Sequence, residues 1–183
     1  LSEKSIKNQF DAAKASFKWF DEKVGAYPYS TMTLVQPPEN AGGAGGMEYP
    51  TLVTTITDLD YSEYMHAAAM VTIHEIGHNY WQGIFASNEF EESWMDEGIN
   101  SYTEGRIMSE TLGQENIVQF AQFSVDMPTV HHVRTAQTPT LDPVKTHGWK
   151  YVSRAGYGTN SYSKPATILN TVERVWGKDK VDQ

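Results

Sequence analysis

The residues best suited to chemistry in this chain are two histidines four positions apart, His74 and His78, which enclose Glu75 in the pentapeptide HEIGH. Residues four apart on a helix lie on one face, about one turn apart, so both imidazoles can bind a single metal ion. The chain has no cysteine, so any metal must be held by histidine and carboxylate side chains. The pentapeptide alone leaves open a second interpretation, a surface helix whose two histidines have ordinary hydrogen-bond partners.

A third candidate ligand is Glu97, which lies 19 residues after His78. We expect it on a second helix that runs back beside the first, which would bring its carboxylate to the imidazoles. Two histidines and one glutamate form a tetrahedral zinc site whose fourth position is left to water, the catalytic arrangement. Glu75 would not bind the metal; it is placed to take a proton from that water and pass it to the leaving amine.

Glu104 follows Glu97 by two helical turns and lies on the same face. It is a candidate to accept a hydrogen bond from the ring N–H of a metal-binding histidine. The alternative is an ordinary solvated carboxylate on a helix.

The elements that must position these residues can be predicted from periodicity. A helix is expected over residues 2–24, with one apolar face formed by Ile6, Phe10, Ala13, Phe17, Phe20 and Val24. Strands are expected over residues 30–35 and 51–57, on either side of a glycine-rich turn at residues 42–46. The helix that carries HEIGH is expected to begin at Asp60, with Glu63 completing a capping box, and to end at Gly83.

The second half of the chain predicts two more helices, over residues 91–111 and 115–125. Residues 128–160 contain several prolines and glycines without a sustained period, so a long irregular connection is expected there. A last helix is expected over residues 165–176, with Pro165 in its first turn and Gly177 as its stop.

Composition limits the classes of function. The chain has 183 residues and a formal charge of −9, which makes nucleic acids and anionic membranes poor partners. Its longest apolar stretch, residues 67–73, is too short to span a bilayer, so no transmembrane segment is expected. The chain begins at Leu1 without an initiator methionine or a signal-peptide pattern, so both ends are expected to be cut from a larger protein.

Four motifs occur in an order and spacing that resemble those of the aminopeptidase N family of gluzincin zinc metallopeptidases. They are Gly45-Gly46-Met47-Glu48-Tyr49, the HEIGH pentapeptide, Trp94-Met95-Asp96-Glu97-Gly98, and Tyr162-Ser163-Lys164 with Tyr157 five residues upstream. The resemblance covers most of the chain.

The resemblance implies an α+β, thermolysin-like zincin catalytic domain, mainly helical, with a small sheet whose edge strand binds the substrate. Residues 1–183 would form this catalytic domain within a larger aminopeptidase, without the β domain that precedes it and the helical domain that follows it in the family. It also implies one zinc ion per chain, bound by His74, His78 and Glu97, with Glu75 as the general base.

Substrate-binding roles follow from the same resemblance. Glu48 would bind the free α-amino group of a peptide, and Gly45, Gly46 and Met47 would form the strand edge that pairs with its main chain. Tyr162 would donate a hydrogen bond to the oxyanion of the tetrahedral intermediate, and Tyr157 would belong to the substrate site.

Two stretches depart from the family pattern and concern side-chain preference. Tyr49 replaces an asparagine, and Asn79-Tyr80-Trp81-Gln82 replaces the commoner continuation after the second histidine.

The sequence therefore predicts a zinc-dependent aminopeptidase that hydrolyses the N-terminal peptide bond of peptides by means of a zinc-activated water. A thermolysin-like endopeptidase is the first alternative, because it would share the zinc and Glu75 but would not need a carboxylate at Glu48. The second alternative is an inactive scaffold that binds other proteins.

Overall fold

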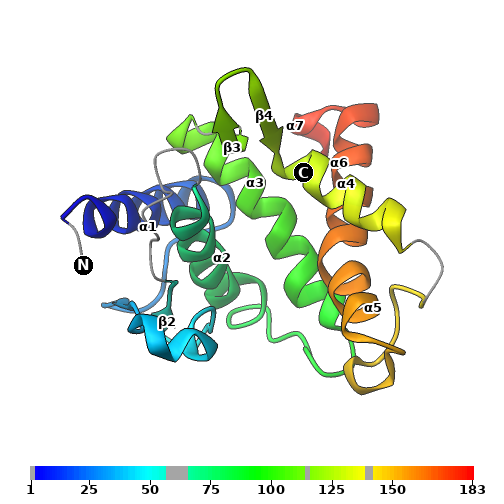
Figure 1. The fold of residues 1–183 in the computed structure, drawn as a ribbon, viewed down its shortest axis with the longest axis horizontal. Helices are drawn as coiled ribbons and strands as arrows, with labels where there is room; N and C mark the ends of the chain where they lie inside the picture. The colour runs from blue at the N-terminus through cyan, green and yellow to red at the C-terminus, as the bar shows by residue number, and fades with distance from the viewer. Residues whose placement is uncertain (1–2, 57–65, 114–115, 139–141) are drawn as a thin grey trace. The chain divides into compact units, whose positions relative to one another are not determined.

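A computed structural model describes residues 3–56, 66–113, 116–138 and 142–183 (Figure 1). They are mostly helical, with two small sheets, which agrees with the expected α+β class at that level of detail. The chain forms two compact units. The first comprises Leu1–Tyr80 and Glu104–Asp126, and the second comprises Trp81–Thr103 and Met127–Gln183.

The first unit begins with the expected helix, α1 (Glu3–Lys23), but the expected apolar face is only partly correct. Ala13 and Phe20 are buried, whereas Ile6 and Phe10 are 41 % and 54 % exposed. The buried face of α1 differs from the expected one because polar side chains on it form hydrogen bonds: Gln9 Nε2 donates to Gln36 Oε1 over 3.0 Å.

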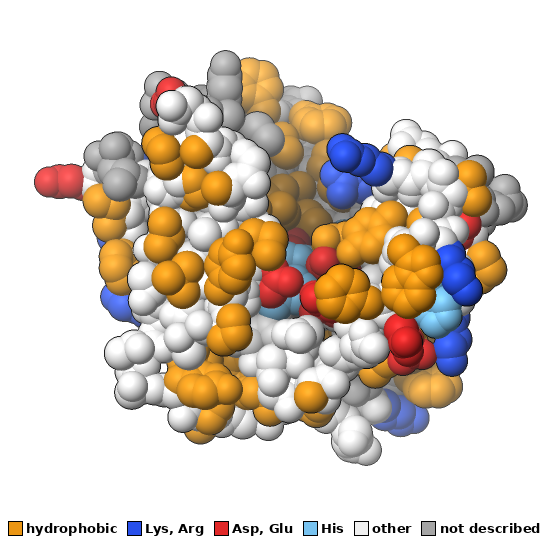
Figure 2. Space-filling model, turned by 90° about the horizontal axis from the view of Figure 1, so that it is seen from below, with side chains coloured by type: hydrophobic (Ala, Val, Ile, Leu, Met, Phe, Trp, Pro, Cys, Tyr) orange, Lys and Arg blue, Asp and Glu red, His pale blue; other side chains and the backbone are white. Residues whose placement is uncertain are grey.

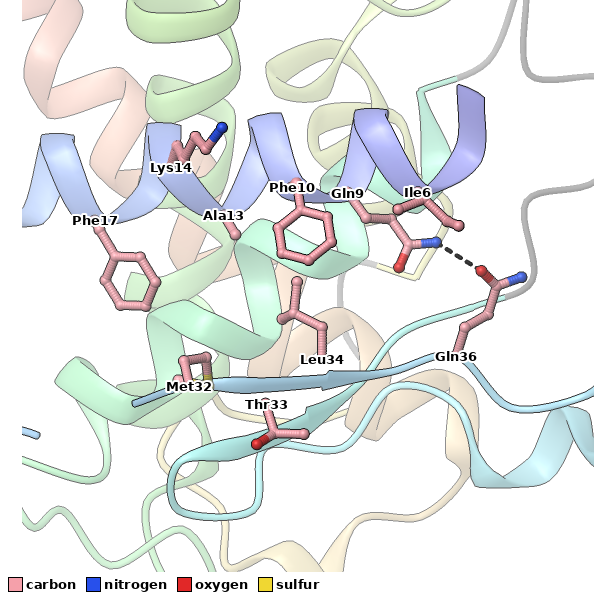
Figure 3. A pocket seen from close by; sticks show the side chains of 10 residues that line it. All are labelled: Ile6, Gln9, Phe10, Ala13, Lys14, Phe17, Met32, Thr33, Leu34 and Gln36. Carbon is pink, nitrogen blue, oxygen red and sulfur yellow. Dashed lines mark hydrogen bonds between the residues drawn. The ribbon is translucent and has the colours of Figure 1, made fainter. Parts of the chain in front are cut away.

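The exposed side chains of α1 line an apolar groove of about 470 Å³ beside the strand β1 (Thr33–Val35), together with Phe17, Met32 and Leu34 (Figure 3). Figure 3 also shows the bond between Gln9 and Gln36 at one end of this groove. The oxygen of the same amide group, Gln9 Oε1, accepts a hydrogen bond from Thr55 Oγ1 over 2.8 Å. A polar side chain can therefore be buried on α1 without leaving its amide group unsatisfied.

The sheet of the first unit is smaller than the sequence indicates. β1 pairs in parallel with β2 (Leu52–Thr54), with Leu34 opposite Val53. Between them the glycine-rich segment forms a 3₁₀ helix, η1 (Glu39–Ala44). Val53 packs with Ala13 and Ile76 in a buried cluster that joins the sheet, α1 and the helix α2 (Ala67–Trp81).

Helix α2 carries the HEIGH pentapeptide, as predicted, and ends before Gly83. Its expected start at Asp60 and the capping partner Glu63 lie outside the described residues.

The prediction of a helix over residues 115–125 is wrong. Residues there form an antiparallel hairpin of β3 (Asn116–Phe120) and β4 (Phe123–Asp126). β-Branched and aromatic side chains favour strands, and they dominate here: Ile117, Val118, Phe120, Phe123 and Val125. Ala121 has a φ of 51°, the left-handed conformation that a two-residue hairpin turn requires.

The second unit contains a π-helical turn, η2 (Trp94–Gly98), which continues into α3 (Ile99–Leu112). Together they correspond to the helix predicted over residues 91–111. Helix α3 begins in the second unit and ends in the first, because the boundary between the units falls after Thr103.

The long irregular connection expected over residues 128–160 is also wrong. This stretch contains nearly all of α4 (Met127–Gln137), a 3₁₀ turn η3 (Gly148–Lys150), α5 (Arg154–Gly158) and the first two residues of a second π-helical turn, η4 (Thr159–Ser163). Pro128 is the second residue of α4, where a missing N–H costs no intrahelical hydrogen bond. Proline there starts a helix instead of interrupting one.

The last predicted helix is confirmed as α6 (Lys164–Trp176), which ends at Gly177 with a φ of 88°, before a short α7 (Lys178–Val181). Helix α4 and Thr138, the residue after it, are bonded to α6 and η4 by pairs of polar side chains. Thr138 Oγ1 lies 2.6 Å from Thr159 Oγ1, and Thr135 Oγ1 lies 3.3 Å from Thr167 Oγ1. Tyr102 on α3 donates to Glu173 on α6.

Hydrophobic side chains also reach the surface, where Figure 2 shows them interspersed with polar ones on one face. Phe90 and Trp149 are among them, each more than 60 % exposed. Among the described residues, none of the helices combines the length and the hydrophobicity that a bilayer span requires.

Candidate functional site

The two histidines of α2 lie close together within the first unit. His74 Nε2 and His78 Nε2 are 3.1 Å apart, and their rings cross at 85°. Two nitrogens bound tetrahedrally to one zinc at ~2.0–2.1 Å would lie roughly 3.3 Å apart. The observed separation therefore fits a pair of imidazoles that share one ion.

Behind His74 lies Glu104, which α3 contributes to the same unit. His74 Nδ1 is 2.9 Å from Glu104 Oε2, and the carboxylate is buried. A carboxylate beside Nδ1 holds the proton on that nitrogen, which leaves the lone pair of Nε2 for a metal. The contact thus selects the tautomer of His74 that can bind a cation.

Glu75 lies between the histidines in sequence and is 5 % exposed. The backbone of Gly46 approaches its carboxylate: a Cβ built on Gly46 would lie 3.5 Å from Glu75 Oε1. Gly46 also has a φ of +68°, a conformation that strongly favours glycine. The glycine therefore allows the segment before β2 to run close to the acid.

The segment of residues 45–48 lies along β2. Gly46 N–H donates to Thr54 O over 2.9 Å, and Thr54 N–H donates to Met47 O over 2.8 Å. A Cβ on Gly45 would lie only 2.8 Å from the carbonyl oxygen of Thr55. The side chain of Glu48, the next residue, is half-buried.

Asn79, which the sequence marks only as a departure from the family pattern, connects α2 to the turn before β2. Its Oδ1 accepts a hydrogen bond from Thr51 N–H over 3.1 Å, and its Nδ2 donates to Glu75 O over 3.3 Å. Its side chain therefore links Thr51 to the backbone of α2 at Glu75. The sequence contains no indication of this contact, because it depends on the packing of the turn before β2.

The second unit holds Glu97 and the two tyrosines. Glu97 is buried on η2, and the hydroxyl of Tyr162 on η4 donates to its Oε1 over 2.5 Å. The ring of Tyr157 meets that of Tyr162 edge to face, with centroids 6.1 Å apart. Burial, and then the charges of Glu97 and Asp96, raise the pKa of Tyr157 to about 12. This phenol is neutral throughout the physiological range.

Both Glu97 and Tyr162 lie on π-helical turns, which are rare and occur often at functional sites. Two further residues join these turns and were not found from the sequence. Ser93 Oγ lies 2.8 Å from Ser161 Oγ, and both serines are buried. Serine has no chemical signature that distinguishes such a pair from ordinary surface residues in a sequence.

The predicted site residues thus divide between the units. His74, Glu75, His78 and Glu104 belong to the first unit, as do Gly45, Gly46, Met47 and Glu48. Glu97, Tyr157 and Tyr162 belong to the second.

The chain also matches a known protein family. The model described as the peptidase family M1 domain matches residues 8–183, nearly the whole chain.

Proposed function

Since the chain belongs to peptidase family M1 and is thus a peptidase, we propose that it is a zinc-dependent aminopeptidase. The observation that carries the proposal is the arrangement on α2: two Nε2 atoms 3.1 Å apart, with Glu104 held against the opposite nitrogen of His74. A carboxylate against the second ring nitrogen is a usual feature of histidines that bind a metal.

We propose that His74, His78 and Glu97 hold one zinc ion, since each of the three offers one ligand atom. Two imidazoles and one carboxylate are a donor set that zinc prefers when a fourth position stays open. When bound, the zinc would lower the pKa of water and polarise the carbonyl of the scissile bond.

Glu75 would act as the general base and then as the general acid. Its carboxylate would take a proton from the attacking water and deliver it to the nitrogen of the leaving amine. Its place on α2 between the two histidines supports this role, because a general base must lie within reach of the water that the metal would hold.

Tyr162 would donate its phenolic hydrogen to the oxygen of the carbonyl as negative charge develops there. In the absence of substrate this hydrogen is directed to Glu97, so the hydroxyl would have to exchange one acceptor for another. Both acceptors carry negative charge, which keeps the exchange inexpensive. Tyr157, packed against Tyr162, would form part of the substrate site.

Glu48 would bind the ammonium group at the N-terminus of the substrate, and the backbone of Gly45, Gly46 and Met47 would pair with its main chain. The main-chain bonds to Thr54 fix this segment along β2. This placement supports the proposal, because main-chain groups on the edge of the segment that faces away from β2 can pair with a peptide. A carboxylate that binds the terminal amine here would determine that the first peptide bond of the substrate is the one cleaved.

Hydrolysis of peptides with a free N-terminus, compared with the same peptides after N-acetylation, tests the aminopeptidase activity. We expect cleavage of the first peptide bond of the free peptides only. Glu48→Gln should lower kcat/KM for free peptides by about tenfold or more, because a charge-assisted bond is lost. Glu39→Gln, the same charge change at an exposed position of η1, is the control. Equal cleavage of free and acetylated peptides would indicate an endopeptidase instead.

A further inference from the structure

The two π-helical turns of the second unit are joined at two points. One is the bond from Tyr162 to Glu97, and the other is the hydroxyl pair of Ser93 and Ser161. Ser161 directly precedes Tyr162, and Ser93 directly precedes the turn that contains Glu97. The serine pair therefore links the backbone on one side of the tyrosine to the start of the turn that carries its acceptor.

The environment of the serine pair makes its hydrogen bond important. Ser93 is 1 % exposed and Ser161 is 0 % exposed, so water cannot replace either partner readily. A buried hydroxyl that loses its partner keeps its full desolvation cost. The pair thus resists any displacement that would separate the two turns.

Close approach of the turns also depends on Gly98, the last residue of η2. A Cβ on Gly98 would lie 2.5 Å from Pro165 Cβ and 2.8 Å from the carbonyl oxygen of Ser161. The absent side chain leaves room for the backbone of Ser161 to contact η2. Packing and hydrogen bonding therefore act at the same residue, immediately before Tyr162.

We propose that Ser93 and Ser161 are positioning residues for Tyr162, which hold its hydroxyl where it can act on the carbonyl oxygen of the substrate. The proposal rests on the proposed function, in which Tyr162 stabilises developing charge. Such stabilisation depends on a donor fixed in advance, and small displacements of the donor reduce it. The serines themselves touch neither substrate nor metal in this account.

The π-helical turn η4 also forms side-chain contacts with segments other than η2. A similar contact nearby supplies a control variant. His131 Nδ1 on α4 lies 3.2 Å from Ser163 Oγ, and Thr138, the residue after α4, bonds to Thr159. Side chains from α4 and from the residue that follows it therefore contact the two ends of η4. The pair of Thr135 and Thr167 also joins α4 to α6, but neither residue belongs to a π turn. Thr135→Val removes a half-buried contact between two hydroxyl groups without touching the contact between the turns.

The test is a double-mutant cycle in the protein that carries this chain. Ser93→Ala and Ser161→Ala are each measured with Tyr162 present and in the Tyr162→Phe background. With the tyrosine present, each serine variant should lower kcat by about threefold to tenfold and leave KM unchanged, because the lost interaction is made in the transition state. In the Tyr162→Phe background the same substitutions should leave kcat unchanged.

Two further measurements separate positioning from a general loss of structure. Zinc content should stay the same in every variant. Thr135→Val should leave kcat unchanged, whatever its effect on the melting temperature, because its contact lies outside both π-helical turns. Ser93→Cys, nearly the same shape with a weaker donor, replaces the alanine variants if neither of them folds.

The possible outcomes are distinct. Equal losses of kcat in both backgrounds, or an equal loss in Thr135→Val, would overturn the positioning role and leave the proposed function intact. An unchanged kcat in Tyr162→Phe alone would overturn the role of Tyr162 in the proposed function, and the positioning role with it.

Discussion

His74 Nδ1 lies 2.9 Å from Glu104 Oε2, within the first unit and away from solvent. Through this contact the residue on α3 determines which nitrogen of the imidazole carries the proton. The effect on a metal is indirect, since Glu104 acts by orienting His74.

Glu104→Gln should therefore weaken zinc binding by about tenfold to a hundredfold, the usual effect of losing such a partner. Competition with a chromogenic chelator measures the affinity directly, independent of catalysis. Glu91→Gln makes the same charge change at an exposed position and should leave the affinity unaltered. Unchanged zinc affinity in Glu104→Gln would show that the carboxylate has only a structural role.

Tyr162→Phe removes the hydroxyl and keeps the ring against Tyr157. If the hydroxyl stabilises developing charge, kcat should fall by ~10²–10³, the cost of removing one oxyanion donor. Initial rates of hydrolysis at saturating substrate give kcat, and measurement of the zinc content shows whether the metal site is intact. A loss confined to KM would assign Tyr162 to substrate binding instead.

Gly98→Ala should destabilise the protein by about 2 kcal/mol, because the new methyl group would overlap Pro165 and the backbone of Ser161. Urea unfolding measures the change. Gly42→Ala is the control, since a Cβ there meets nothing within 4 Å. Equal stability of the two variants would mean that the turns can separate at little cost.

The raised pKa of Tyr80 predicts how the free energy of unfolding depends on pH. Burial, and then the nearby Tyr27 and Asp21, raise its pKa to about 12, from an ordinary value of 10.0. The folded state therefore holds the phenolic proton more tightly than the unfolded state. The contribution of this proton to the free energy of unfolding is fully present below pH 10 and is lost as the pH rises toward 12.

Tyr80→Phe should lessen this alkaline loss of stability. The ring stacks on Phe20 with centroids 4.0 Å apart, and phenylalanine preserves that contact. The Tyr80 hydroxyl is buried without a hydrogen-bond partner among the described residues, so its removal should cost little at pH 7. Urea midpoints at pH 7 and pH 11 measure both effects. Parallel losses in the two proteins would show that Tyr80 does not contribute to the alkaline transition.

Much of the candidate site could be predicted because the chemistry is local. The placement of His74 and His78 on one face follows from helix geometry, and α2 (Ala67–Trp81) confirms the helix around them, while its predicted start at Asp60 lies outside the described residues. The joined turns of the second unit could not be predicted in this way. Ser93 and Ser161 are far apart in sequence, and π-helical turns have no period that distinguishes them from ordinary helix.

The errors in the fold have a similar origin. A short run that contains Ile117 and Val125 fits both a helix and a strand by periodicity, and the preference of its side chains for strands decides the outcome. Pro128 lies in the first turn of α4, because proline ends a preceding helix and is equally compatible with the first turn of the next one. On α1, Gln9 displaced Phe10 from the buried face because its amide finds partners on two other segments.

The most direct test of the central claim, a zinc peptidase in which Glu75 moves the proton, is to measure zinc content and peptide hydrolysis together in Glu75→Gln. We expect one zinc per chain to remain and hydrolysis to slow by ~10²–10⁴, the contribution of a general acid–base group. The amide preserves the size of the side chain, so the zinc ligands should be undisturbed. Hydrolysis at the wild-type rate by zinc-loaded Glu75→Gln would contradict the account.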